Sequence, residues 1–223
     1  MRWGVVQFPG SCDERDALAA CARTGEARLL WHGDRELGDL DAVVVPGGFS
    51  YGDYLRAGAI ARFSPVMEAV ASFAREGGPV LGICNGFQVL CEAGLLPGAL
   101  LVNEGIRFVC RQVEIVVESD ASPFTAGLAP GDRLSIPVKH GEGRFFAPDD
   151  LLDEIEGRGQ VALRYAPGQN PNGSAREIAG VTNEAGNVLG LMPHPEHAVD
   201  ELTGSRDGRR LFEAVAAGVG APA

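Results

Sequence analysis

One strand–turn–helix segment constrains the fold of this chain more than any other. A short apolar run over 80–83 predicts a buried strand, and residues 86–93 predict a helix. Cys84 lies at the junction, with Gly82 and Gly86 two residues to either side. This is the cysteine form of the nucleophile elbow, a strained turn that lifts one side chain above a sheet. The helix N-terminus favours a thiolate, so Cys84 is a candidate nucleophile; a cysteine that only fills an apolar position is the alternative.

A cysteine nucleophile needs a base, and His194 is the best placed of the four histidines. It follows an apolar strand and lies between Pro193 and Pro195, which favour extended backbone. Residues two apart in an extended segment face the same side, so we expect Glu196 to approach and orient the imidazole from near the surface. Cysteine, histidine and glutamate from distant segments form a set used in acyl transfer. An ordinary polar loop is the alternative for this stretch taken alone.

A double glycine after another strand supplies candidates for an oxyanion site. Residues 41–46 predict a buried strand, and Gly47, Gly48 and Phe49 follow it. Consecutive glycines let backbone N–H groups turn into a cleft and approach a ligand closely. This strand and the strand before Cys84 would end at one edge of a parallel sheet, where α/β proteins bind ligands. A plain turn is the alternative for Pro-Gly-Gly in isolation.

A metal site is a second interpretation of the histidine loop, because His197 lies three residues after His194. The chain lacks the patterns His-Glu-x-x-His and Cys-x-x-Cys, and the loop prolines prevent the helical spacing that such ligands use. We therefore predict no metal site and expect His197 to be a solvated loop residue.

Composition limits the classes of function. The 223 residues can bury one sizeable core, and we expect a single domain over 1–223. The formal net charge of −11 argues against nucleic acid or an anionic membrane as a partner. The N-terminus enters a strand directly, without a secretory signal, and five sparse cysteines are expected to be reduced, which indicates the cytoplasm. Lys139 is the only lysine beside eighteen arginines, which we attribute to compositional bias.

The order of the predicted elements changes near the middle of the chain. Strands and helices alternate in the first half, which indicates a parallel sheet with helices on its faces. From about residue 107 strands dominate, and turns at 170–173 and 185–187 join the later ones as antiparallel or mixed pairs. The predicted strands are 3–8, 27–31, 41–46, 79–83, 107–118, 134–139, 160–165, 177–183 and 187–192. The predicted helices are 12–24, 64–76 with Ser64 as its N-cap, 86–93 and 204–217.

The motifs together resemble the class I, or triad, glutamine amidotransferases, through Cys84 in Gly-Ile-Cys-Asn-Gly-Phe-Gln and the later His194-Pro-Glu196. Four further stretches narrow the resemblance to the glutaminase subunits of phosphoribosylformylglycinamidine synthase, an enzyme of purine biosynthesis. They are Pro46-Gly-Gly-Phe-Ser-Tyr-Gly-Asp53-Tyr-Leu-Arg56, Lys139-His-Gly-Glu-Gly-Arg144, Asn170-Pro-Asn-Gly-Ser174 and Gly186-Asn-Val-Leu-Gly-Leu-Met-Pro-His194. The resemblance covers nearly the whole chain. It implies an α/β fold with an open, mostly parallel sheet flanked by helices, the flavodoxin-like amidotransferase fold, and additional antiparallel strands in the C-terminal half.

The resemblance also implies a reaction and its partners. Cys84 would attack the side-chain amide carbon of glutamine, His194 would carry the proton, and Glu196 would orient His194. In that family the ammonia passes to a separate ATP-dependent synthetase subunit, and a small third subunit bridges the two. The chain lacks the phosphate-binding pattern Gly-x-x-x-x-Gly-Lys-Ser/Thr, so we expect no cofactor on it and place ATP and Mg²⁺ on the synthetase.

Further positions carry implied roles in holding the substrate. The backbone N–H groups of Gly48 or Phe49 and of Asn85 would form the oxyanion hole. Gln88, one turn into the helix after the elbow, would contact the substrate, as would the backbone near His140. These five assignments come from the resemblance, and the double glycine gives independent support only at Gly48 and Phe49.

The sequence departs from the family pattern at three places. The early loop lacks the asparagine that usually precedes Cys12, Ala57 stands where a cysteine is common, and His197 stands where an arginine is usual. None of these positions belongs to the triad. The departures therefore concern partner contacts or loop packing rather than the chemistry.

Two other classes of function stay open on the sequence alone. Another triad amidotransferase or a free-standing cysteine hydrolase would keep the same triad, but the Gly-Gly-Phe-Ser-Tyr-Gly-Asp loop argues against it. A non-catalytic α/β binding subunit would have no use for the three triad residues together. Phe49, Tyr51 and Tyr54 are candidates for a partner surface, with packing in the core or a lid as the alternative.

Overall fold

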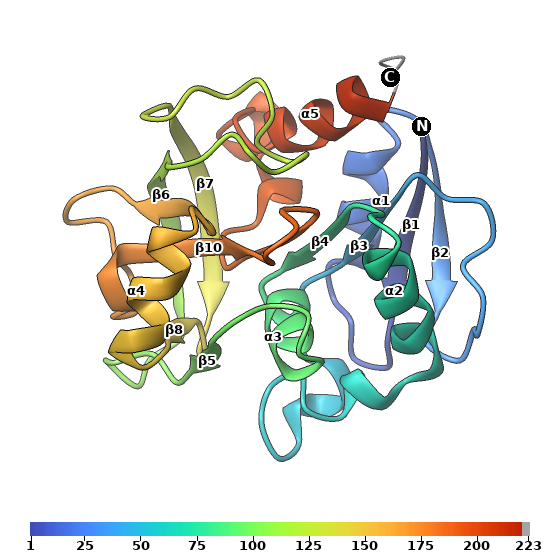
Figure 1. The fold of residues 1–223 in the computed structure, drawn as a ribbon, viewed down its shortest axis with the longest axis horizontal. Coiled ribbons are helices and arrows are strands. Elements are labelled where there is room, and N and C mark those ends of the chain that lie inside the picture. The colour runs from blue at the N-terminus through green and yellow to red at the C-terminus, as the bar shows by residue number, and fades with distance from the viewer. Residues whose placement is uncertain (220–223) are drawn as a thin grey trace.

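A nine-stranded mixed sheet forms the centre of the protein (Figure 1). The structure is a computed structural model that describes residues 1–219; the last residues of the predicted domain, 220–223, lie outside the described residues. The strand order in the sheet is β2-β1-β3-β4-β11-β10-β9-β6-β7, and β5 pairs with β8 separately. The strands are β1 (Arg2–Gln7), β2 (Glu26–Trp31), β3 (Ala42–Val45), β4 (Val80–Ile83), β5 (Ala99–Leu101), β6 (Val109–Val117), β7 (Arg133–His140), β8 (Arg144–Phe146), β9 (Val161–Tyr165), β10 (Ile178–Thr182) and β11 (Val188–Leu191).

The five strands β2, β1, β3, β4 and β11 pair in parallel and build the half of the sheet that carries the chemistry. Every residue of β3, β4 and β11 is buried, and their sequences are almost wholly apolar. This composition suits a parallel sheet, because helices cover both of its faces. The carboxyl ends of β3, β4 and β11 meet at one edge, so the segments that follow them are neighbours.

The other half of the sheet is antiparallel. β10 runs antiparallel to both β11 and β9, and β6 and β7 extend the sheet beyond β9. The turns predicted at 185–187 and 170–173 lie in the connections β10–β11 and β9–β10, and both are confirmed as connections between antiparallel strands. The predicted class, an open α/β sheet with added antiparallel strands in the C-terminal half, is therefore confirmed.

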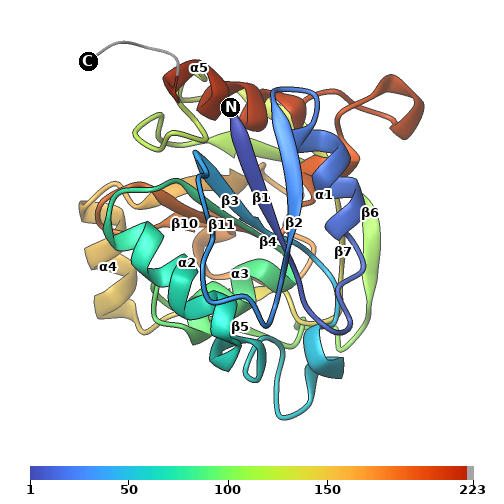
Figure 2. The same ribbon diagram turned by 90° about the vertical axis from the view of Figure 1, so that its right-hand side faces the viewer.

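Helices cover both faces of the sheet. They are α1 (Glu14–Cys21), α2 (Pro65–Arg75), α3 (Asn85–Glu92), α4 (Asp149–Gly157) and α5 (Arg209–Val219). α1 and α5 lie on one face, and α2 and α3 lie on the other (Figures 1 and 2). α5 is held to the sheet by Phe212, whose ring centroid lies 6.0 Å from that of Trp3 in β1. No helix within residues 1–219 combines the length and the apolar character needed to cross a membrane.

Several predicted boundaries were wrong, for local reasons. The helix predicted at 12–24 begins only at Glu14, because the preceding Asp13 has non-helical backbone and turns its carboxylate to a distant lysine. The helix predicted at 204–217 begins at Arg209, since Gly204 is left-handed (φ 100°), Ser205 forms an isolated β-bridge with Asp200, and Asp207 accepts from the backbone of Ser135. Ser64 does precede α2, but its hydroxyl pairs with Tyr51 instead of capping the helix. β5, β8 and α4 were not predicted.

Candidate active site

Cys84 occupies a strained turn between β4 and α3. Its φ of 51° and ψ of −105° are values that residues other than glycine rarely adopt. A side chain at Gly86 would collide with the carbonyl of Val45, and one at Gly82 would collide with Leu90 and the backbone of Gly86. The two glycines therefore let the turn pack against its neighbours, as the sequence predicts for a nucleophile elbow. The Sγ atom lies 3.8 Å from the carbonyl oxygen of Lys139.

A pocket at the carboxyl edge of the parallel strands gathers most of the predicted site. Six of the eight predicted residues line it: Gly48, Phe49, Cys84, Gln88, His140 and His194. The other two, Asn85 and Glu196, are buried and contact residues of that wall. The pocket thus exposes the candidate nucleophile and the candidate base to the same space.

His194 meets Glu196 as predicted, although not in the predicted way. Nδ1 of His194 lies 2.6 Å from Oε1 of Glu196. The expected extended segment is wrong, because Pro195–His197 forms a short 3₁₀ turn that brings the two side chains together. The expected surface position of Glu196 is also wrong, since the residue is only 3 % exposed. Oε2 of Glu196 and Nε2 of His194 are buried and have no hydrogen-bond partner among the described residues.

The charges around His194 favour its protonated form. Burial lowers the pKa of the imidazole, but the negative charges of Glu196 and Cys84 and the hydrogen bond to Glu196 outweigh burial and raise the pKa to about 10. Glu196 also fixes the tautomer: its carboxylate accepts from Nδ1–H, so in the neutral ring Nε2 is the atom free to take a proton. That atom is the one without a partner.

The double glycine lies next to the base and to Asp13. A side chain at Gly47 would collide with the carboxylate of Asp13 and come within 2.8 Å of Cε1 of His194. Gly48 has a φ of 146° and packs against the backbone of the loop before α1. The N–H of Phe49 donates to the carbonyl of Gly10 at 2.9 Å, so in this conformation it supplies no donor to the pocket.

The side chain of Asn85 ties the 3₁₀ segment Ser50–Asp53 to α3. Its Oδ1 accepts from the backbone N–H of Ser50 at 3.1 Å, and its Nδ2 donates to Asp53 and to Gln88. Nε2 of Gln88 in turn donates to the carbonyl of Glu142. Gln88 therefore lines the pocket in a fixed orientation. The resemblance singled out only the backbone of Asn85, whereas the structure adds a role for its side-chain amide.

Burial and one amide fix the tautomer of His140. Oδ1 of Asn172 accepts from the backbone N–H of Ser174, so its Nδ2 is the group that donates to Nε2 of His140 at 2.9 Å. Nε2 is therefore an acceptor, and Nδ1 carries the proton without a partner among the described residues. Burial, and to a smaller extent the charge of His194, lowers the pKa of His140 to about 4, which keeps the ring neutral at pH 7.

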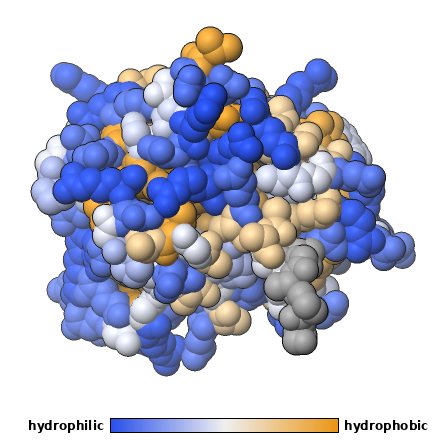
Figure 3. All heavy atoms as spheres, turned by 90° about the horizontal axis from the view of Figure 1, so that it is seen from above, coloured by the Kyte–Doolittle hydropathy of each residue, from blue (hydrophilic) through white to orange (hydrophobic). Residues whose placement is uncertain are grey.

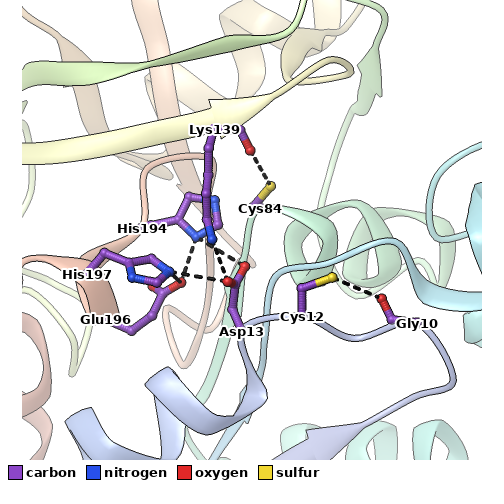
Figure 4. A network of polar contacts seen from close by, with 8 residues as sticks. All are labelled: Gly10, Cys12, Asp13, Cys84, Lys139, His194, Glu196 and His197. Atoms are coloured by element: carbon purple, nitrogen blue, oxygen red, sulfur yellow. Dashed lines mark hydrogen bonds and ion pairs between the residues drawn. The ribbon is translucent and has the colours of Figure 1, made fainter.

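A carboxylate that the sequence did not point to lies behind the base. Oδ1 of Asp13 lies 2.5 Å from Nζ of Lys139 and 3.2 Å from Nε2 of His197, and Oδ2 lies 3.6 Å from Nδ1 of His194 (Figure 4). His197 is therefore half-buried and paired rather than a solvated loop residue. The one signal available in the sequence was weak: Lys139 is the only lysine.

The same residues raise the question of a metal again. One ligand atom from each of Asp13, His194, Glu196 and His197 lies within 4.8 Å of the others. The ammonium of Lys139 already contacts Asp13 there, and Nδ1 of His194 already binds Glu196. A cation at this place would have to displace both contacts, so the residues fit an ion-paired cluster better than a metal site.

For Tyr51 the structure favours packing, the second of the two sequence alternatives. Tyr51, offered as a partner contact, points inward: its hydroxyl lies 2.8 Å from both Nδ1 of His32 and Oγ of Ser64. Phe49 and Tyr54 remain exposed, at 51 % and 74 %.

Comparison with known proteins gives one consistent family. Residues 1–213 match the CobB/CobQ-like glutamine amidotransferase domain. The phosphoribosylformylglycinamidine synthase subunit PurQ of Rubrobacter xylanophilus is 60 % identical over 98 % of this chain and 99 % of its own. The protein of the same name from Frankia casuarinae is 58 % identical over 97 % of this chain and 94 % of its own.

A solved structure gives the same result. A chain in the structure of PurLQS from Thermotoga maritima superposes with a TM-score of 0.90 and 44 % identity, over 98 % of both chains. The chain therefore resembles these proteins closely both in sequence and in the fold that carries the elbow and the histidine loop. The chain belongs to the CobB/CobQ-like glutamine amidotransferases and, within them, to the PurQ subunits of phosphoribosylformylglycinamidine synthase.

Proposed function

We propose that this chain hydrolyses glutamine with Cys84, His194 and Glu196 and delivers the ammonia to a synthetase subunit. That partner would use ATP and Mg²⁺ to convert formylglycinamide ribonucleotide to formylglycinamidine ribonucleotide, and a small third subunit would bridge the two. The names of the relatives and the likeness to a chain of the Thermotoga maritima PurLQS complex support the assembly. The observation that carries the chemistry is the unpartnered Nε2 of His194 in the pocket that Cys84 also lines.

In the first half of the reaction, Nε2 of His194 takes the thiol proton of Cys84, and the resulting Sγ thiolate attacks the carboxamide carbon of glutamine. The carbonyl oxygen becomes an oxyanion in the tetrahedral intermediate. The C–N bond then breaks, His194 returns the proton to the leaving nitrogen, and ammonia departs from a glutamyl thioester. Glu196 holds the ring and stabilises the imidazolium that exists between these two proton transfers.

In the second half, water attacks the thioester carbon and gives a proton to His194. The C–S bond breaks, glutamate leaves, and the Cys84 and His194 pair returns to its starting state. Both tetrahedral intermediates need oxyanion donors. The backbone N–H of Asn85, at the first turn of α3, and that of Gly48 are the candidates on either side of Cys84.

The loop at Gly48 gives a physical basis for control by the partner. The N–H of Phe49 is committed to the carbonyl of Gly10, so one implied donor is turned away from the substrate. Glycine lets the loop adopt more than one arrangement, and docking of the synthetase would favour the one with the donor in place. Loss of one oxyanion donor typically costs about 10²–10³ in rate, so the isolated chain would be a slow glutaminase.

The rim of the pocket is the surface that we assign to the synthetase. Phe49 and Phe108 line the pocket and are each more than half exposed, and Tyr54 and Leu55 lie on the loop that follows Phe49. Figure 3 views the opposite end of the molecule, over α5, where hydrophilic residues predominate and hydrophobic ones are scattered. An apolar rim that a partner covers would close the pocket and keep ammonia away from solvent.

We further propose a cytoplasmic location and no bound cofactor on this chain. All five cysteines are unpaired, as expected in a reducing compartment. Cys84, His194 and Glu196 supply nucleophile, proton carrier and orienting group, and backbone N–H groups can bind the oxyanion, so this mechanism of hydrolysis uses no cofactor.

One experiment tests the proposal most directly. Glutamine hydrolysis is measured for the isolated chain, for the chain with its synthetase and bridging subunits, and for the same assembly with Cys84→Ser. We expect a slow basal rate, a rise of about 10²-fold or more on assembly, and no glutamine-dependent activity for the variant. Ammonia-dependent synthesis by the variant assembly should persist. Glutamine-dependent activity that survives Cys84→Ser would refute the proposed nucleophile.

A further inference from the structure

The carboxylate of Asp13 connects three segments that surround the candidate base. Its side chain is only 5 % exposed, and it lies at the start of α1, between β7 and the loop of the catalytic histidine. Lys139 of β7 and His197 of the histidine loop both contact Oδ1, and His194 lies 3.6 Å from Oδ2. Figure 4 shows these contacts converging on Asp13, beside the contact between His194 and Glu196.

Two carboxylates therefore flank Nδ1 of His194, one at 2.6 Å and one at 3.6 Å. Two full negative charges so close to a buried imidazole would strongly favour its protonated form and would disfavour a thiolate at Cys84. The ammonium of Lys139 offsets one of these charges, because it contacts Asp13 directly. The charges of Asp13 and Lys139 cancel only when both side chains are ionised.

Lys139 is well placed for this task. Burial lowers the pKa of Lys139, but the hydrogen bond to Asp13 and the charges of Asp13, Glu196 and Cys84 outweigh burial, so the net shift is upward. The positive charge of Lys139 therefore interacts with the catalytic groups. Of the nineteen lysine and arginine residues in the sequence, the other eighteen are arginines. A compact ammonium fits against a single carboxylate oxygen, whereas a guanidinium fork needs a wider site.

We propose that Asp13 and Lys139 form a positioning pair whose balanced charges set the pH range in which Cys84 and His194 form a reactive thiolate–imidazolium pair. The inference rests on the proposed function of Cys84 and His194, and it assigns a role to two residues that do not themselves react. Positive charge beside the pair favours loss of its protons, and negative charge opposes it. Each half of the Asp13–Lys139 pair therefore acts in the opposite sense.

The variants test this sign. Lys139→Met leaves the negative charge of Asp13 unopposed and should move the reactive range to higher pH by about one unit or more. Asp13→Asn leaves the ammonium unopposed and should move the range to lower pH by a similar amount. The double variant has neither charge and should return towards the unmodified protein. The titratable and charged groups that face His194 are Glu196 and His197 of its own loop, Asp13 before α1, Cys84 at the elbow, and Lys139 and His140 of β7.

The measurement is the rate at which iodoacetamide alkylates Cys84, followed by peptide mass spectrometry from pH 5 to pH 10 on the full chain. The mass readout separates Cys84 from Cys12, which also lines the pocket. Alkylation needs no glutamine and no partner, so its pH midpoint reports on the pair even if glutaminase activity proves to lie elsewhere. The matched control is Arg133→Met, which removes an exposed cation from the same strand and should leave the midpoint unchanged.

Opposite displacements of the midpoint in the two single variants, with recovery in the double variant, are the expected result. Displacement in the same direction, or reduced reactivity with an unchanged midpoint, would overturn the proposal and leave the pair a purely structural role. If Lys139→Met fails to fold, Asp13→Asn and the double variant still differ only in the lysine. The midpoint of the double variant must then be the higher of the two, and equal midpoints would refute the proposal.

Discussion

Nδ1 of His194 and Oε1 of Glu196 lie 2.6 Å apart in the interior of the protein, and neither residue is more than 3 % exposed. Glu196 makes this contact from a 3₁₀ turn, and its second oxygen has no partner among the described residues. The imidazole is thus the main polar partner of a buried carboxylate. Such a carboxylate orients the ring without competition from water.

Glu196→Gln should slow glutamine hydrolysis by about 10²–10⁴-fold, because an amide can select the wrong tautomer of His194 and cannot stabilise the imidazolium. The buried position predicts a second effect, a change in unfolding free energy, since the group that replaces the carboxylate has no solvent to satisfy it. Steady-state kinetics and urea denaturation measure the two effects separately. His194→Ala should cost at least as much activity. Wild-type turnover in Glu196→Gln would show that Asp13 or another group orients the histidine.

A glutamine analogue that carries an electrophile should label Cys84 and spare the other four cysteines. Cys21 and Cys91 are protected because burial raises their thiol pKa values well above the usual range. Cys12 is the informative control, since it also lines the pocket but burial and the charge of Asp13 raise its pKa. Mass mapping of the labelled peptide decides the matter, and labelling centred on Cys12 would refute the assignment of the nucleophile.

The backbone of Cys84 predicts a trade between activity and stability. At φ 51° and ψ −105° an L-residue is strained by about 1–3 kcal/mol, and glycine is not. Glycine usually destabilises a protein relative to alanine by about 0.5–1 kcal/mol. Here Cys84→Gly should be more stable than Cys84→Ala by about 1 kcal/mol, while both variants lose glutaminase activity. The measurement is the unfolding free energy of the two inactive variants, and the ordinary order, alanine above glycine, would show that the turn is relaxed.

The parts of the site that follow from local sequence were predictable. The elbow needs glycines on both sides of Cys84, and the double glycine needs a strand before it, so both are visible as short patterns. The parallel pairing of β3 with β4 followed from their apolar runs and brought the two patterns to one edge. His194 and Glu196 are only two residues apart, so their contact was also accessible, although its backbone geometry was not.

The cluster behind the base was not predictable in the same way. Asp13 and Lys139 are 126 residues apart in the chain, and no periodicity links them. Their contact depends on where β7 and the start of α1 come to lie after the whole sheet has formed. The amide of Asn85 is a similar case in part, because two of its three partners, Ser50 and Asp53, lie on one short 3₁₀ segment more than thirty residues before it. Contacts of this kind depend on tertiary packing, which local propensity does not encode.

Asp53 should make stability depend on pH. Burial and the charge of Glu142 raise the pKa of Asp53 to about 6, against the opposing hydrogen bond from Asn85. The folded state therefore binds this proton more tightly than the unfolded state, and stability is lost as pH rises from about 4 to about 6. Asp53→Asn removes that cost. We compare the unfolding free energies of the variant and the unmodified protein at each pH. After allowance for solvent around this half-buried group, the difference in favour of the variant should be about 1–2 kcal/mol larger at pH 7.5 than at pH 4.

Denaturant titrations of both proteins at the two pH values measure this difference. Asparagine can keep an acceptor toward Nδ2 of Asn85, so the comparison isolates the charge. A gain of equal size at pH 4 and pH 7.5 would mean that the substitution acts through packing and that the carboxylate ionises without penalty.

The apolar rim predicts how the chain couples to its partner. Leu55 is 90 % exposed and lies two residues after Asp53, which lines the pocket, so a charge there should oppose docking of the synthetase. Leu55→Asp should weaken the complex about tenfold or more and lower glutamine-dependent synthesis, while synthesis from free ammonia by the synthetase stays unchanged. Leu202→Asp is the matched control, because Leu202 is 97 % exposed on a segment that does not line the pocket. Binding measured by interferometry and nitrogen-donor assays on the assembled enzyme separate docking from chemistry. Equal effects of the two substitutions, or full glutamine coupling in Leu55→Asp, would place the synthetase on another face of the molecule.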